Sequence, residues 1–360
     1  MPIPILIGIG VLLAGGYGVK KGIDGHNSHS EADEIIGRAK RRYNDQKSSF
    51  DDQEKNTQKA LEQLGTLELD IGAKFDEFQR IVEDLLKKLN QGAKNKLEIN
   101  LPKHQLEKIE NYTFTALGVL GSVAGAGVAG TAAGFAVYGG VMTFAAASTG
   151  TAISALSGVA ATNATLAAIG GGALSAGGLG MAGGTAILGA AVAAPVLAIA
   201  GWAYASHGEE ALRNARKARD EADIAIEKLR KAEQSLQRIE EYAGRLHMAL
   251  ERIYSDFQYR YLAPLREAHR MVLNGQDPSE AESELKEMIV SGYLLAAILT
   301  NIITTPLFKV MEDKNGKSIN DKDDMPIMEK DSDGSMILNA SKIDEVIKNQ
   351  HQEFNALNQK

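Results

Sequence analysis

The amino-acid sequence predicts a mainly all-α protein, in which a long antiparallel coiled-coil stalk flanks an Ala- and Gly-rich transmembrane hairpin. Three observations lead to this prediction. Residues 111–208 contain no Asp, Glu, Lys or Arg, although the whole chain has 39 basic and 46 acidic residues. Apolar side chains repeat every seven residues on both sides of that segment, which is typical of coiled coils. Short apolar runs around Asn-Gly and Asp-Gly dipeptides near the C-terminus favour a small β-meander.

The N-terminal residues 1–22 form a predicted apolar anchor. No charged side chain precedes Lys20 and Lys21. A signal peptide would carry its basic residues before the apolar run, whereas here they follow it. The positive-inside rule then places the N-terminus outside and the following chain in the cytoplasm. The alternative is a helix that packs against the apolar bundle in a soluble form.

Residues 30–110 are predicted to be the first coiled-coil arm. Apolar residues fall seven apart from Ile36 onward, although Gln46 and Gln53 occupy positions where apolar side chains are expected. Gly92 and Pro102 indicate a break before a short helix that leads to residue 111. The predicted seam residues of this arm are Leu64, Ile71, Phe78 and Leu85.

The charge-free segment, residues 111–208, holds 29 Ala and 21 Gly. A soluble helix needs a polar face, whereas a run of roughly 18 apolar residues is typical of a membrane span. Small residues recur four apart, a spacing that lets helices approach closely in a bilayer. A soluble helical bundle buried inside an oligomer is the alternative. The residues predicted to form this glycine zipper are Gly121, Gly125, Gly130, Gly134, Gly150, Gly158, Gly180 and Gly184.

Within that segment the sequence predicts helices over residues 115–147, 151–169 and 179–205. Basic residues precede the segment and follow it, so both ends are expected on the same side of the membrane. This arrangement favours two crossings, with residues 151–169 re-entrant or lying in the interface because their Ser, Thr and Asn side chains are costly against lipid. Four crossings are the alternative.

Residues 209–273 are predicted to be the second arm. Its apolar spacing alternates between three and four residues from Ala215 to Phe257. Folding back on the first arm gives the antiparallel stalk, which ends at Pro264 and the turn around Gly275. The predicted seam residues of the second arm are Leu229, Leu236, Ile239, Leu246, Leu250 and Ile253.

The C-terminal part comprises a predicted helix over residues 279–308 and a small segment over residues 309–360. Asn315-Gly316 and Asp333-Gly334 suit two-residue hairpin turns, which predicts the β-meander. A disordered acidic tail is the alternative. Ser341, with Asp344 three residues later, is predicted to cap a last helix that runs toward Leu357.

Composition and motifs argue against several classes of function. The net charge of -7 argues against general nucleic-acid binding, and the absence of Cys excludes disulfides. The glycines from Gly125 to Gly130 match a dinucleotide fingerprint, but no strand precedes them and no acidic residue follows at the required distance. Neither the calcium-loop-like Glu329, Asp331 and Asp333 nor the linker residues His26, His29 and Glu31 form a convincing metal site. We therefore expect no enzyme activity, cofactor or metal.

The zipper from Gly121 to Gly184 and the repeats ending at Leu89 and starting at Ala215 together resemble α-helical pore-forming proteins. The layout is similar to that of cytolysin-A-type helical toxins and, more loosely, apolipoprotein L. It also resembles uncharacterised bacterial coiled-coil proteins with an Ala- and Gly-rich hairpin, some of them labelled chemotaxis proteins. An apolar N-terminus suggests action on the cell's own membrane, as in a self-toxin or an immune effector against viruses.

The leading hypothesis is a helical membrane effector that oligomerises and inserts its apolar hairpin to permeabilise or remodel a bilayer. Its expected partners are the lipid bilayer, further copies of itself and a protein that triggers it, but not nucleic acid. The expected location is a bacterial inner membrane, with the coiled coils in the cytoplasm. The runner-up is a membrane-anchored coiled-coil scaffold or signalling protein that forms no pore.

Overall fold

The computed structural model describes residues 22–89, 102–122, 132–137, 208–277, 281–314, 318–319, 327–332 and 336–358. The predicted N-terminal anchor and most of the charge-free segment lie outside these residues. So do Gly125, Gly130, Gly150, Gly158, Gly180 and Gly184 of the predicted zipper, and the predicted helices over residues 151–169 and 179–205.

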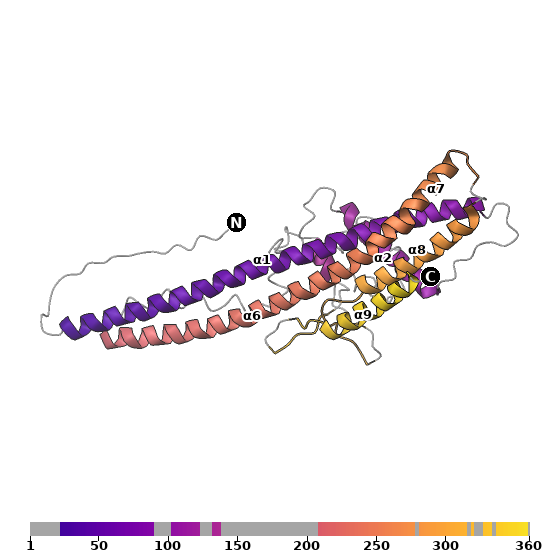
Figure 1. The fold of residues 1–360 in the computed structure, drawn as a ribbon. Coiled ribbons are helices and arrows are strands. Elements are labelled where there is room, and N and C mark those ends of the chain that lie inside the picture. Colours follow the sequence, from indigo (N-terminus) through magenta and orange to yellow (C-terminus); the bar gives the residue numbers. More distant parts are fainter. Residues whose placement is uncertain are drawn as a thin grey trace. The chain divides into compact units, whose positions relative to one another are not determined.

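The described residues are mainly helical, as the sequence predicts (Figure 1). Their helices are α1 (Gly22–Leu89), α2 (Lys103–Ser122), α6 (Gly208–Asp256), the π-helix η4 (Phe257–Leu262), α7 (Ala263–Leu273), α8 (Glu282–Ile303) and α9 (Ala340–Leu357). Residues 132–137 are helical as well. The chain divides into two compact units. Unit 1 comprises Met1–Ser48 and Ala193–Arg230, and unit 2 comprises Ser49–Val192 and Lys231–Lys360.

In unit 1, the starts of α1 and α6 pair in parallel. Ala32 of α1 packs with Ala211 and Ala215 of α6. Further along both helices, the Arg42 guanidinium pairs with the Asp223 carboxylate at 2.8 Å. The contact partners therefore advance together along the two helices.

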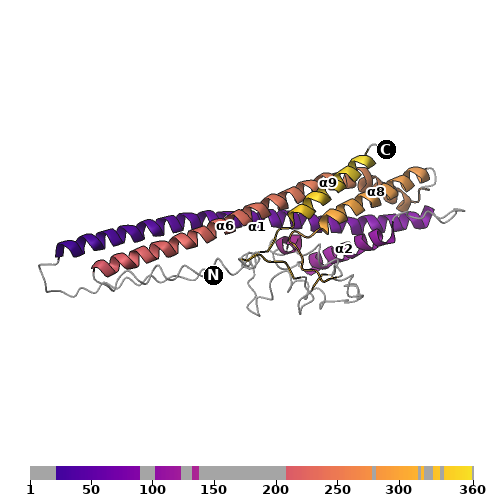
Figure 2. The same ribbon diagram turned by 90° about the horizontal axis from the view of Figure 1, so that it is seen from below.

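Unit 2 has the same direction of pairing (Figure 2). Ser49 donates a hydrogen bond to Glu233 at 2.6 Å. Two later contacts join Asp70 to Tyr254 and Glu77 to Arg266. The predicted antiparallel stalk is therefore wrong. A heptad repeat specifies a seam but not the direction of its partner, and residues 90–207 are a connection long enough to bring α6 back to the start of α1.

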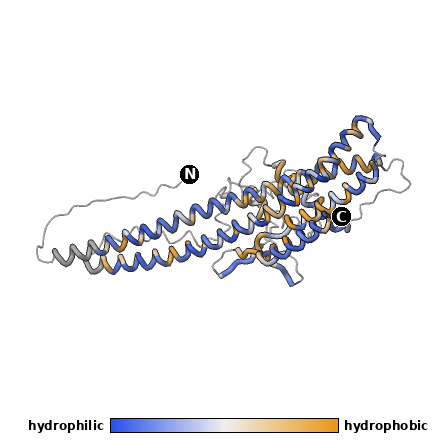
Figure 3. The backbone as a smooth tube through the Cα atoms, viewed as in Figure 1, coloured by the Kyte–Doolittle hydropathy of each residue, from blue (hydrophilic) through white to orange (hydrophobic). Residues whose placement is uncertain are grey.

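Helix α8 lies in the core of unit 2, against α2, α9 and η4. Its chain approaches α1 closely, because a methyl group built on Gly292 would lie 2.7 Å from the Phe78 ring. Apolar residues concentrate where these helices meet, whereas polar residues cover the outer faces of α1 and α6 (Figure 3). Among the described residues, α8 is the one helix long and apolar enough to cross a membrane, yet 61% of its most apolar window is buried.

The chain from α6 to α7 stays helical through Pro264, the first of the two signals that the sequence offers for the end of the stalk. Pro264 lies in the first turn of α7, directly after the π-helical turn of η4. Helix α7 ends at Leu273, where the second arm is predicted to end. The following Gly275 has a φ of 86°, the left-handed conformation that glycine adopts at helix ends.

The C-terminal segment forms isolated antiparallel bridges, and no strand is found in its described residues. Two bridges, Glu312 with Ser318 and Lys330 with Met336, flank the predicted Asn-Gly and Asp-Gly turns. The pairing differs from that of a meander, because the backbones of residues 309, 329 and 337 hydrogen-bond in a closed triangle. Residues 311, 319 and 327 form a second triangle. Three short segments thus satisfy one another's backbone groups without making a sheet.

Helix α9 begins at Ala340, two residues earlier than a cap at Ser341 predicts, so Ser341 does not cap it. Asn339 is the N-cap residue, without a side-chain cap hydrogen bond. Its amide group instead donates to the carbonyl oxygen of Pro306 at 3.2 Å. The cap thereby fastens α9 to the chain that follows α8.

Candidate functional site

One face of α1 in unit 2 is built for close contact with the charge-free segment. Gly65, Glu68, Leu69 and Gly72 share this face because residues three, four and seven apart lie on one side of a helix. A methyl group built on Gly65 would lie 1.8 Å from the Ala132 carbonyl oxygen. At Gly72 it would lie 2.3 Å from the Ala116 side chain. We call Gly65, Glu68, Leu69 and Gly72 the glycine surface of α1.

The segment that packs on this surface starts as part of a continuous helix. The sequence places an element boundary near residue 111, but α2 runs through it to Ser122. Its buried side has one apolar residue at almost every turn, namely Ile109, Tyr112, Ala116 and Val119. A change in charge composition is therefore not a break in the helix, because apolar burial continues across it.

Aromatic rings join the two described pieces of the charge-free segment to the core. Tyr112 of α2 lies edge-on to Phe75 of α1, with ring centroids 6.1 Å apart. Phe135, in residues 132–137, lies 6.2 Å from the Tyr112 ring. Both rings are fully buried. The start of the segment is thus held by packing as well as by close backbone contact.

Glu68 is a buried acid in the middle of the glycine surface. Its relative exposure is 3%, and burial raises the pKa of its carboxyl group well above the usual range. The Tyr112 hydroxyl donates to the Glu68 backbone carbonyl at 2.5 Å. No ion pair of Glu68 occurs within the part of the chain that the structure describes. An acid in this position favours its neutral form, because a charge would be desolvated without compensation.

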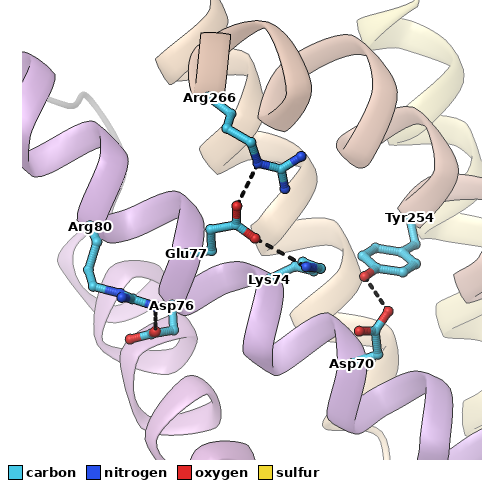
Figure 4. A network of polar contacts seen from close by, with 7 residues as sticks. All are labelled: Asp70, Lys74, Asp76, Glu77, Arg80, Tyr254 and Arg266. Carbon is cyan, nitrogen blue, oxygen red and sulfur yellow. Dashed lines mark hydrogen bonds and ion pairs between the residues drawn. The ribbon is translucent and has the colours of Figure 1, made fainter. Parts of the chain in front are cut away.

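Beside this surface, polar contacts tie α1 to α6 and α7 (Figure 4). The Tyr254 hydroxyl donates to the Asp70 carboxylate at 2.5 Å. Glu77 accepts from Arg266 at 2.6 Å and from Lys74 at 3.1 Å, and these cations, chiefly Arg266, lower its pKa. These contacts join α1 to α6 and α7 without involving α2.

A separate set of contacts fastens α2 to the C-terminal helices. The Lys108 ammonium group donates to the Asn301 side chain of α8 at 2.9 Å. Asn301 in turn donates to Gln350 of α9 at 3.4 Å. Burial lowers the pKa of Lys108 to about 8. Separating α2 from the body would therefore break this link as well as the glycine contacts.

The outward face of α2 is apolar too. Phe114 and Leu117 are exposed, and methyl groups built on Gly118 or Gly121 would meet nothing within 4 Å. Of the two predicted zipper residues that the structure describes, Gly121 is exposed and Gly134 is buried. They therefore do not share one surface in this state. The hydroxyl groups of Thr113 and Thr115 bond to backbone carbonyls of α2 itself.

All ten predicted seam residues are buried on α1 or α6, at 5% relative exposure or less. They are Leu64, Ile71, Phe78, Leu85, Leu229, Leu236, Ile239, Leu246, Leu250 and Ile253. Burial alone does not identify a coiled coil, because unit 2 also packs α2 and α8 around the same helices. Gly65, Glu68 and Gly72 were not predicted, although their three-, four- and seven-residue spacing on a predicted helix is visible in the sequence.

No group of three or more potential metal ligands occurs among the residues that the structure describes. Asp333 and the fingerprint from Gly125 to Gly130 lie outside those residues, as do the side chains of His26 and His29. No protein-family model matches the chain, and neither a curated protein nor a solved structure matches it. The site's own geometry is therefore the basis for a functional proposal.

Proposed function

We propose that the protein is a helical membrane effector, which inserts its charge-free segment to permeabilise or remodel a bilayer. In the structure described above, the glycine surface of α1 holds the start of that segment inside unit 2. The single observation behind this proposal is the pair of backbone-close contacts at Gly65 and Gly72, made to a segment without charged residues. They provide a stored state for residues that would otherwise present an apolar surface to water.

Two further features of α2 support this proposal. Its outward face is apolar at Phe114 and Leu117, so no side of the helix after residue 111 carries a charge. Its threonine hydroxyls are satisfied within the helix, which lowers the cost of moving them into lipid. The same helix therefore suits a protein interior and a bilayer. Oligomerisation through the predicted zipper belongs to the proposed inserted state.

A reversible crosslink tests whether α2 must leave the body. The protein has no native Cys, so Lys108→Cys with Asn301→Cys can be bridged by a short bismaleimide that contains a cleavable disulfide. These two side chains meet at 2.9 Å in the native protein. We expect the crosslinked protein to release no dye from vesicles, and a reducing agent to restore release.

The matched control carries the same crosslinker between Ser49→Cys and Glu233→Cys, which joins α1 to α6 at a native contact of 2.6 Å. Because the proposal does not separate these helices there, this protein should release dye in both states. Release by a fully crosslinked 108–301 protein would show that α2 need not move. If the unmodified protein releases no dye from any vesicle, the scaffold hypothesis replaces the effector.

A further inference from the structure

The glycine surface contains a buried ionisable residue, Glu68, whose presence its packing alone does not explain. Glu68 is 3% exposed and lies between Gly65 and Gly72, which bring α1 into close contact with the charge-free segment. The Phe75 and Tyr112 rings beside it are fully buried, and the Tyr112 hydroxyl donates to its backbone carbonyl. An apolar residue would stabilise such a contact, whereas an acid there is costly whenever it ionises. A costly residue at a contact that must open is a means of controlling the opening.

We propose that Glu68 is a proton-dependent latch, whose neutral carboxyl group keeps the glycine surface closed on the charge-free segment and whose ionisation opens it. Only the consequence of its opening, membrane insertion, rests on the proposed function. The opening itself can be measured without a membrane. The latch is built from the part of α1 that follows Ser48, from α2 and from residues 132–137, all within unit 2.

The groups that face Glu68 do not supply a compensating charge. Tyr112 from α2 and Tyr254 from α6 are the titratable side chains coupled to this site. A phenol ordinarily stays neutral below about pH 10, and burial together with Asp70 raises the pKa of Tyr254 further. Residues 132–137 contain no titratable side chain. On α8, the titratable side chain is Tyr293, whose pKa is raised by burial and by Glu110 and Glu83, without a contribution from Glu68.

Linkage gives the direction of the effect. Burial raises the pKa of Glu68 in the closed state, whereas a solvated carboxyl group in the open state titrates near its ordinary value of 4.5. Closing therefore takes up a proton between these two pKa values. Below the lower pKa the closed state has its full stability relative to the open state. It loses this stability as the pH rises toward the higher pKa. The opening equilibrium then grows by up to about tenfold per pH unit.

Hydrogen exchange of the lipid-free protein tests the latch. The quantity to follow is the protection factor of backbone amides in residues 112–122, between pH 6 and pH 9. We expect this factor to fall with pH in the parent and to stay level in Glu68→Gln, which keeps the shape without the charge. A second neutral variant, Glu68→Met, should also show a protection factor that does not change with pH. It provides the test if the Glu68→Gln protein folds poorly.

The matched control is Glu83→Gln, at an exposed position of the same helix, which should follow the parent. A level profile in the parent, or a parental fall in both neutral variants, would overturn the latch. Dye release from vesicles, recorded on the same proteins, separates the two proposals. Glu68-dependent protection without dye release keeps the latch and removes the effector function, whereas release with level protection does the opposite.

Discussion

The same two helices, α1 and α6, pair in both units but bury different side chains. In unit 1 the buried residues are mostly Ala, at Ala32, Ala39, Ala211, Ala215, Ala218, Ala222 and Ala225. In unit 2 they are large, and Phe75 and Phe257 meet at 5.4 Å between ring centroids. Unit 2 also has α2, α8 and α9 around the pair, whereas the described part of unit 1 has the two helices alone.

This difference assigns different roles to one helix pair. Because hydrophobic stabilisation scales with the apolar area removed from water, Ala contacts stabilise unit 1 less per residue than the rings stabilise unit 2. Unit 2 is where a stored state has to be held, and its glycine surface adds close contacts to the large core. The predictions below test this contrast between the units, from the largest expected effect to the smallest.

The largest contrast should come from truncating the buried apolar side chains. Phe75→Ala in unit 2 should lower the free energy of unfolding by about 3–5 kcal/mol, because it removes a fully buried ring. Ile36→Ala in unit 1 removes a half-buried side chain and should cost roughly 1 kcal/mol. Urea titration followed by far-UV circular dichroism measures both. Equal losses would mean that the Ala-rich pairing is as strong as the aromatic core.

The glycines should respond with opposite signs in the two units. Gly72→Ala puts a methyl group into the Ala116 contact and should lower stability by about 1–3 kcal/mol. Gly37→Ala in unit 1 meets only the end of the Arg41 side chain at 3.6 Å, so improved helix propensity should raise stability by about 0.5–1 kcal/mol. Thermal melting of each variant reads the sign. A gain at Gly72 would show that the glycine surface is not tightly packed.

The smallest effects should come from polar contacts between α1 and α6. Tyr254→Phe removes the donor to Asp70 in unit 2 and should cost about 1 kcal/mol. Arg42→Gln in unit 1 breaks an ion pair whose side chains are 55% and 43% exposed, and should cost at most about 0.5 kcal/mol. Melting at low and at high salt distinguishes the two. An Arg42 effect that persists at high salt would contradict its assignment to a screened surface pair.

The sequence by itself determined the helical class, which positions of α1 and α6 are buried, and two helix ends. Leu64, Ile71 and Leu250 are buried because apolar repeats on charged helices leave only one face to bury. Leu89 and Leu273 end helices near Gly and Pro signals that are visible in the sequence. These features depend on residues close together in the chain, so local patterns suffice to predict them.

Only the tertiary structure decided the direction of pairing and the candidate site. The heptads of α1 and α6 fit a parallel or an antiparallel partner equally well, and the contacts from Ala32 with Ala211 to Glu77 with Arg266 are parallel. In the sequence, Glu68 is one of many charged residues on a charged helix. In the fold it is buried, because Ala132 and Ala116 pack against the neighbouring Gly65 and Gly72. Its burial depends on residues far away in the chain. Sequence patterns describe what each helix exposes, but they do not determine which helix covers it.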